Sequence, residues 1–187
     1  MNEVEDRFLA DAWAARLRGG AEAARLLPAP PGPNLARGRA ATQSSIGPFS
    51  RGRTVAEDAA GAVNGCPTGG FQFHTAEEAR PWWQVDLGAP ARVREIRLFN
   101  RLDSPAMAAR LRDFAIETSG DGTHWMIVHV ARPTDPPVGG IDGAPLCLRF
   151  PAPVPARFVR IVLRGGGVLH LDQVEVYGDA PSGGVGQ

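Results

Sequence analysis

The stretch WWQVDLGAPARVREIRLFNR, residues 82–101, decides the fold class of this 187-residue chain. Apolar and polar residues mostly alternate in WWQVDL and again in RVREIRLFNR. Alternation with a period of two is typical of a strand that buries one face. We therefore predict two short strands here, with Trp82 and Trp83 on opposite faces, one in the core and the other directed outward.

Further segments of the same kind follow along the chain. They are short and rich in branched or aromatic residues: RDFAIETS (112–119), HWMIVHV (124–130), PLCLRF (145–150), RFVRIVL (157–163) and LHLDQVEVYG (169–178). About seven or eight strands without a long intervening helix predict an all-β fold, an antiparallel β-sandwich or barrel. In the last segment His170 alternates with Leu169 and Leu171, which predicts that His170 faces outward.

The ends of the chain differ from this pattern. Residues 1–27 are predicted to be an N-terminal helical segment, because apolar residues recur there at the spacing of a short amphipathic helix: Phe8, Leu9, Trp13 and Leu17. Residues 28–33, PAPPGP, form a Pro-rich linker, since proline lacks the amide donor that a helix needs. The strands occupy residues 34–178, and residues 179–187 are predicted to be a disordered tail. A free helix of this length is marginal in water, so we expect it to dock on its own sandwich or to join copies of the chain in a homo-oligomer.

Composition excludes several classes of function. The 20 acidic residues balance the 20 basic ones, so nucleic acid is not an expected partner. No run has the length of a transmembrane span, and the start MNEVEDRFL is acidic where a secretory signal is positive. We therefore expect a cytoplasmic protein or one exported by a non-classical route. No G-x-S-x-G elbow and no histidine pair with metal-ligand spacing on a helix occurs, so we do not expect an enzyme.

Several blocks, in their order and spacing, resemble the discoidin or coagulation factor 5/8 type C family. They are NLARGRAATQSS (34–45), AGAVNG (60–65), HTAEEARPWWQVDLG (74–88), ARFVRIVL (156–163) and LHLDQVEVYG (169–178). The resemblance covers residues 34–178 and implies the galactose-binding-like jelly roll, a β-sandwich. Members of this family bind diverse ligands, among them sugars, phospholipid head groups and proteins, so the fold alone leaves the function open.

A narrower resemblance is to the fucose-binding F-type lectins and related carbohydrate-binding modules within that family. Their motif is a histidine, twenty-six residues, an arginine, one residue, an aspartate, four residues, and an arginine or lysine. His74, Arg101 and Asp103 fit this spacing. Arg110 follows Asp103 after six residues instead of four, which places a two-residue insertion in the loop SPAMAA, 104–109. The resemblance thus implies a sugar site at His74, Arg101 and Arg110, with Asp103 holding an arginine in place.

The lectins also carry two adjacent cysteines that pack against the sugar, and here Ser104 and Pro105 follow Asp103 instead. Apolar contact to the sugar would then come from Met107, Phe71 or Phe73. The residue types suit the chemistry, because guanidinium groups donate strong hydrogen bonds to sugar oxygens and an imidazole offers one further polar nitrogen. The alternative is that Arg101 and Arg110 are solvated residues at a loop end.

Three functions follow from these observations. The first is a non-catalytic module that binds fucose or a galactose-like residue on a glycan. The second is a protein-interaction or assembly module whose sugar site has decayed. The third is binding to a membrane surface through the loop SSIGPFSRGR, where Ile46 and Phe49 lie beside Arg51 and Arg53.

Relatives in this family often hold a structural calcium ion between the AGAVNG loop and the last strand. Asn64 and Gln173 stand where those relatives commonly carry an aspartate and a glutamate, and Asp172 offers its carbonyl or its side chain. Calcium affinity depends on the number of charged oxygen ligands, so two amides weaken such a site. The alternatives are a weakly bound calcium ion and a loop that Asn64 and Gln173 close by hydrogen bonds without metal.

Overall fold

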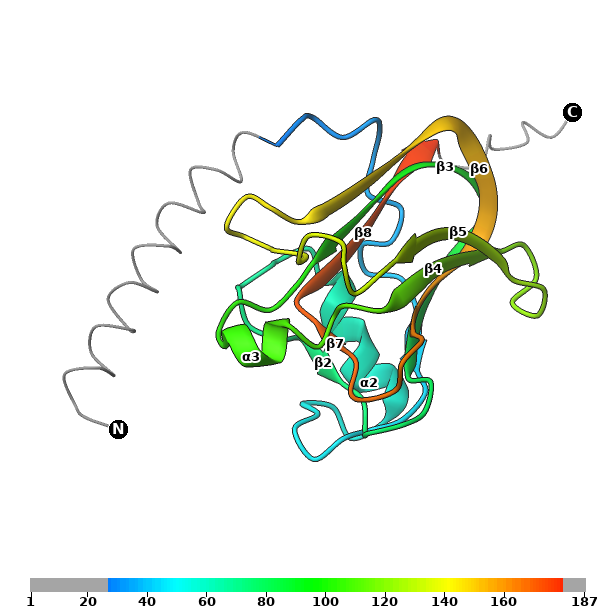
Figure 1. Cartoon of the computed structure of the whole chain (residues 1–187). Coiled ribbons are helices and arrows are strands. Elements are labelled where there is room, and N and C mark those ends of the chain that lie inside the picture. The colour runs from blue at the N-terminus through cyan, green and yellow to red at the C-terminus, as the bar shows by residue number, and fades with distance from the viewer. Residues whose placement is uncertain (1–26, 180–187) are drawn as a thin grey trace, which may run out of the picture.

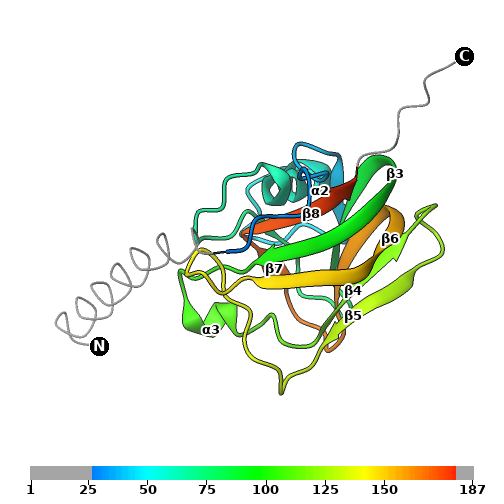
Figure 2. The same cartoon turned by 90° about the horizontal axis from the view of Figure 1, so that it is seen from above.

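The computed structural model describes residues 27–179 (Figures 1 and 2). The predicted N-terminal helix, apart from Leu27, and the tail beyond Asp179 lie outside the described residues. The strands are β1 Ala41–Gln43, β2 Phe73–His74, β3 Trp82–Phe99, β4 Phe114–Ser119, β5 Met126–Ala131, β6 Leu146–Leu163, β7 His170–Leu171 and β8 Gln173–Asp179. Short helices lie between them: α2 Val55–Ala59, the 3-10 helix η1 Ala60–Val63 and α3 Pro105–Ala108. Within residues 27–179 no helix is both long enough and apolar enough to cross a membrane.

The long strands β3 and β6 take part in both layers of a sandwich. The first half of β3 pairs with β1 and with the second half of β6, which continues the sheet to β4 and β5. The second half of β3 pairs with β8 and with the first half of β6. Figure 1 shows β3 and β6 curving together across the top of the molecule. All of these pairs are antiparallel, so the antiparallel β-sandwich predicted from the sequence is confirmed.

The prediction of two separate strands within residues 82–101 was wrong, because β3 is continuous. Its ladder with β6 shifts register between Asp86 and Ala91, so the Gly-Ala-Pro segment is an irregularity inside one strand. Gly88 has a φ of +86°, and its N–H donates to Asp86 Oδ1 at 2.8 Å. β6 likewise unites PLCLRF and RFVRIVL. The turn residues therefore mark a bend, and the strand continues because its partner bends with it.

The tryptophan pair follows the predicted alternation. Trp83 is fully buried and its Nε1–H donates to Ala59 O at 3.0 Å, whereas Trp82 is only half-buried. Phe73 stacks on Trp83 with ring centroids 5.9 Å apart. Complete burial of one such aromatic side chain contributes about 1.5–3 kcal/mol. This packing fixes the short strand β2 and, with it, the next residue, His74.

Both ends of the domain are tied to β3. The guanidinium of Arg97, which is paired with the buried Glu95, donates to Pro28 O at 2.7 Å, so the Pro-rich linker is attached to the sandwich where it begins. At the other end β8 reaches Asp179, the first residue of the predicted tail, whose carboxylate pairs with Arg94 at 2.8 Å.

Candidate functional site

His74 is held in one orientation by its backbone and its ring. β2 pairs with β7, which sets His74 opposite His170. The backbone N–H of His74 donates to Asp58 Oδ2 at 2.8 Å, and Nδ1 lies 2.8 Å from Thr75 O. Because a carbonyl oxygen only accepts, Nδ1 carries the proton and Nε2 presents a lone pair. Burial lowers the pKa of His74, and the charges of the nearby arginines act in the same direction, so the ring is neutral at pH 7.

The carboxylate of Asp58 accepts hydrogen bonds from several segments around His74, and the sequence analysis did not identify it. Its Oδ1 accepts the N–H groups of Arg51 at 2.6 Å and Gly52 at 3.0 Å, while Oδ2 accepts from Gln43 Nε2 and from His74. Asp58 is buried on α2, a helix whose N-terminus has a capping box. The one local signal was the capping sequence TVAE at residues 54–57, which predicts a helix start but does not indicate which loops Asp58 reaches.

Arg101 lies just after the end of β3 and is oriented by Asp103. Its Nε donates to Asp103 Oδ1 at 2.6 Å and its Nη2 to Oδ2 at 2.7 Å, a bidentate pair. Burial raises the pKa of Asp103, but the hydrogen bonds from Arg101 outweigh it and leave this pKa below its ordinary value. The guanidinium carbon lies 4.5 Å from the centroid of the Phe71 ring. Within residues 27–179 the hydrogen bonds of this side chain both go to Asp103 and use Nε and Nη2, and Arg101 is 8% exposed.

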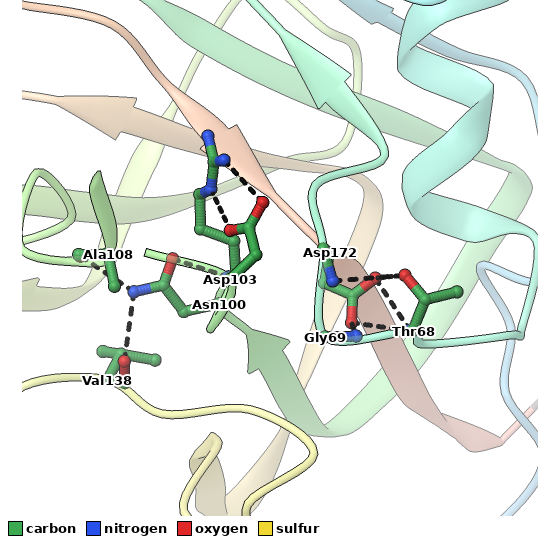
Figure 3. A network of polar contacts seen from close by, with 9 residues as sticks. Thr68, Gly69, Asn100, Asp103, Ala108, Val138 and Asp172 are labelled. Carbon is green, nitrogen blue, oxygen red and sulfur yellow. Dashed lines mark hydrogen bonds and ion pairs between the residues drawn. The ribbon is translucent and has the colours of Figure 1, made fainter. Parts of the chain in front are cut away.

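Asn100 joins Arg101 to the inserted loop (Figure 3). Its Oδ1 accepts the backbone N–H of Arg101 at 2.9 Å, and its Nδ2 donates to Ala108 O at 2.9 Å and to Val138 O at 3.1 Å. The insertion SPAMAA forms α3, with Pro105 at the start of the helix, where its missing N–H costs nothing. The second arginine, Arg110, comes directly after this helix.

Arg110 lies at the periphery of the site. Its side chain is exposed and lines a cavity of about 220 Å³ together with Glu77, Gly166 and Val168. Its charge is near enough to lower the pKa of both His74 and His170. The structure therefore brings His74, Phe71 and Arg101 into contact and places Arg110 within electrostatic range of them.

Two phenylalanine rings contact the ring of His74. Phe49 and Phe71 meet its ring edge-on, with centroids 5.4 Å and 5.5 Å away. Phe49 is 67% exposed and Phe71 is half-buried, so both offer apolar surface beside the imidazole. Phe73 has no exposed surface, because it is packed on Trp83 in the core, and it therefore cannot contact a sugar. The sequence assigned Phe49 to a membrane-binding loop and missed its position beside His74.

His170 packs against His74 and is buried, which corrects the prediction that it faces outward. The two ring centroids are 5.6 Å apart, and His170 is 1% exposed. Neither of its ring nitrogens has a hydrogen-bond partner in the part of the chain that the structure describes. Burial, followed by the charge of Arg101, lowers the pKa of His170 to about 3. The rings of His74 and His170 thus form a neutral pair close to two cationic side chains.

The residues considered for calcium do not form a site that fits the ion. Both oxygens of Asp172 accept hydrogen bonds from backbone N–H groups, so they face donor hydrogens where a cation requires lone pairs directed at it. Asn64 Oδ1 accepts from Cys66 N at 2.7 Å, as the metal-free alternative requires, but the fully buried amide of Gln173 has no hydrogen-bond partner in residues 27–179, so the prediction that Gln173 closes the loop by hydrogen bonds was wrong. Within residues 27–179 no cluster of three or more His, Cys, Asp or Glu side chains is placed to hold a metal ion.

The chain is similar to known proteins in sequence and in fold. Residues 40–171 match the F5/8 type C domain. Fucolectin from Anguilla anguilla is 28% identical over 152 residues, which cover 78% of this chain and 90% of that protein. The lectin domain of lectinolysin, solved in complex with Lewis B antigen, has a TM-score of 0.63 at 28% identity over 79% of this chain and 98% of that one. A fucolectin from striped bass (Morone saxatilis) serum has a TM-score of 0.64 at 31% identity over 80% of this chain and 50% of that one.

Proposed function

Because this chain belongs to the F5/8 type C domain family, we propose that it is a non-catalytic carbohydrate-binding module for fucose or a galactose-like residue on a glycan. The observation that carries the proposal is the neutral ring of His74 beside the guanidinium of Arg101, joined through Phe71. The relatives support it, since two are fucolectins and a third is a lectin domain complexed with a Lewis antigen.

The arrangement offers one acceptor and two charged donors. A sugar hydroxyl donates to Nε2 of His74, while Nη1 of Arg101 and the guanidinium of Arg110 donate to neighbouring sugar oxygens. The exposed ring of Phe49 and the half-buried ring of Phe71 supply the apolar surface for the C–H face of a pyranose. These rings take the place of the cysteine pair that this chain lacks. Phe49 belongs to the sugar site in this proposal, and we therefore do not favour membrane binding through its loop.

The test is calorimetric titration with fucose and galactose. Arg101→Ala is expected to cost roughly 1.5–3 kcal/mol of binding free energy, because a charged donor is lost, and Arg101→Lys is expected to rescue poorly because a point charge does not reproduce the planar fork. The matched control is Arg157→Ala, which breaks a similar bidentate pair with Asp86 on the sheet. A wild-type protein that binds neither sugar, or an Arg101→Ala variant as tight as the control, would overturn the proposal.

The affinity of one site is expected to be weak, because each hydrogen bond to the sugar replaces one to water. Several sites on one glycan surface would raise the total strength. We propose that the sequence-predicted helix of residues 3–27 gathers copies of the chain for this purpose. Deleting residues 1–26 and deriving the number of copies per particle from the mass in solution tests this: the deletion is expected to lower the number of copies, and an unchanged number would contradict it.

A further inference from the structure

The carboxylate of Asp172 is the centre of a buried hydrogen-bond cluster at the junction of β7 and β8 (Figure 3). The side chain is fully buried. Thr68 N donates to its two oxygens at 3.0 and 2.8 Å, Gly69 N donates to Oδ2 at 2.7 Å, and Thr68 Oγ1 donates to Oδ1 at 3.2 Å. Gln72 Nε2 lies 3.5 Å from Oδ1. One anion thus holds a loop that lies more than a hundred residues away in the sequence.

The loop has the backbone shape that an anion requires. Gly69 has a φ of +83°, in the left-handed region that a residue with a Cβ rarely adopts. Successive N–H groups that turn toward one point form a concavity with a positive potential, and a carboxylate is the natural occupant. Burial raises the pKa of Asp172 above its ordinary value, and the hydrogen bonds from Thr68 and Gly69 oppose that rise, so the N–H groups offset part of the loss of water around the carboxylate.

The loop held by Asp172 supports the proposed sugar site at several points. Gly69 O accepts the N–H of Leu102, the residue between Arg101 and Asp103, at 2.7 Å. Gln72 N donates to Leu171 O at 2.8 Å, which aligns the start of β2 with β7. Between these two residues lies Phe71, whose ring contacts Arg101 and His74.

We propose that Asp172 is a positioning residue of the site, whose carboxylate holds residues 66–72 by hydrogen bonds and without a calcium ion. The family resemblance implies a cation between this loop and the last strand, and the chain places an anion among N–H donors there. Asn64 and Gln173 are neutral, so they add no charge that would attract the ion. The part of the inference that concerns ligand affinity rests on the proposed function, and the part that concerns the loop does not.

The first experiment measures amide hydrogen exchange of residues 66–72 in the full-length wild-type chain, with excess EDTA and with excess calcium chloride. The rates are expected to agree within about twofold, since no metal holds the loop. Loss of protection in EDTA that calcium restores would overturn the proposal. This measurement needs no variant and no sugar.

The second experiment compares Asp172→Asn with the control Asp86→Asn. The carboxylate of Asp86 likewise accepts a hydrogen bond from a backbone N–H, that of Gly88, and it also pairs with Arg157. Exchange at Thr68 and Gly69 is expected to accelerate about 10- to 100-fold in Asp172→Asn, the loss of a hydrogen bond to a charged group, and to stay unchanged in the control. Fucose affinity is expected to fall at least about tenfold in the same variant. If Asp172→Asn does not fold, Thr68→Ala takes its place, with exchange at Gly69 expected to rise severalfold.

The outcomes separate the two proposals. Unchanged exchange at Thr68 and Gly69 in Asp172→Asn would show that the carboxylate does not hold the loop. A faster loop with unchanged fucose affinity would overturn the positioning role and leave sugar binding intact. If Asp172→Asn speeds exchange at Thr68 and Gly69 while the wild type binds no sugar, the proposed function is refuted and the role of Asp172 in holding the loop stands.

Discussion

His170 and Asp172 lie two residues apart, and both are fully buried, yet the molecule satisfies them in opposite ways. The Asp172 corner, formed by Asp172 with Thr68 and Gly69, supplies both carboxylate oxygens with N–H donors. The β2–β7 pair leaves both nitrogens of His170 without a partner among the described residues. A carboxylate is charged at neutral pH and cannot be buried without donors, whereas an imidazole can be buried by giving up its proton. The comparison teaches that Asp172 holds its loop through its negative charge, whereas His170 packs against His74 as a neutral ring.

Removing the charged member of this pair is expected to have the largest effect. Asp172→Ala leaves the buried N–H of Gly69 without an acceptor and removes the bonds from Thr68, which is expected to lower the free energy of unfolding by roughly 4 kcal/mol. Urea denaturation at pH 7 measures this loss. The control Asp86→Ala removes a more exposed ion pair and is expected to cost about 1 kcal/mol. Equal losses of unfolding free energy in the two variants would mean that Asp172 stabilises the fold no more than an exposed ion pair does.

The buried, neutral His170 is expected to make the folded protein sensitive to acid. The pKa of His170 is about 3 in the folded protein, below the ordinary value of 6.5. As the pH falls below 6.5, the unfolded chain takes up the proton first, so wild-type stability declines by about 1.4 kcal/mol per pH unit until the folded-state pKa is reached. His170→Phe removes this proton uptake. The stability of the variant relative to wild type is expected to increase by roughly 3 kcal/mol between pH 7 and pH 4, and parallel stability curves would contradict the account.

The smallest expected effect is that of chelation. If hydrogen bonds to Asp172 close the loop, EDTA is expected to lower the melting temperature by no more than about two degrees, against several degrees for a tightly bound ion. Differential scanning calorimetry of the wild type, with and without added calcium, makes the comparison. A drop of several degrees would show that the Asp172 corner does depend on a metal.

The sequence predicted the layers of the fold better than the limits of its strands. Alternation identified the segments that became β3 to β6 and predicted that one tryptophan of the pair is buried and the other is not; the structure assigns the core position to Trp83. It failed at Gly88, because local turn chemistry does not reveal that β3 resumes its pairing with β6 after the register shift between Asp86 and Ala91. It failed again at His170, because both faces of β7 are buried. Alternation along this strand therefore does not tell a buried side chain from an exposed one.

The site was predictable only where its members keep a fixed spacing. The family motif identified His74, Arg101 and Asp103, which the structure links through Phe71 and a bidentate ion pair. Phe49 reaches His74 from a loop, and Asp58 reaches it from helix α2. No spacing rule records such contacts, because they arise when separate segments pack together.

The central claim is that a neutral His74 accepts a hydrogen bond from the sugar, and nitrogen-15 NMR of the imidazole during a fucose titration at pH 7 tests it most directly. The account predicts a proton on Nδ1, none on Nε2, and a fucose-dependent shift of Nε2, while the signals of the exposed His124 do not move. It also predicts that the Nε2 response persists at pH 6.5, because burial lowers the pKa of His74, and disappears once acid protonates the ring. A proton found on Nε2 before the sugar is added, or His74 signals indifferent to saturating fucose, would contradict it.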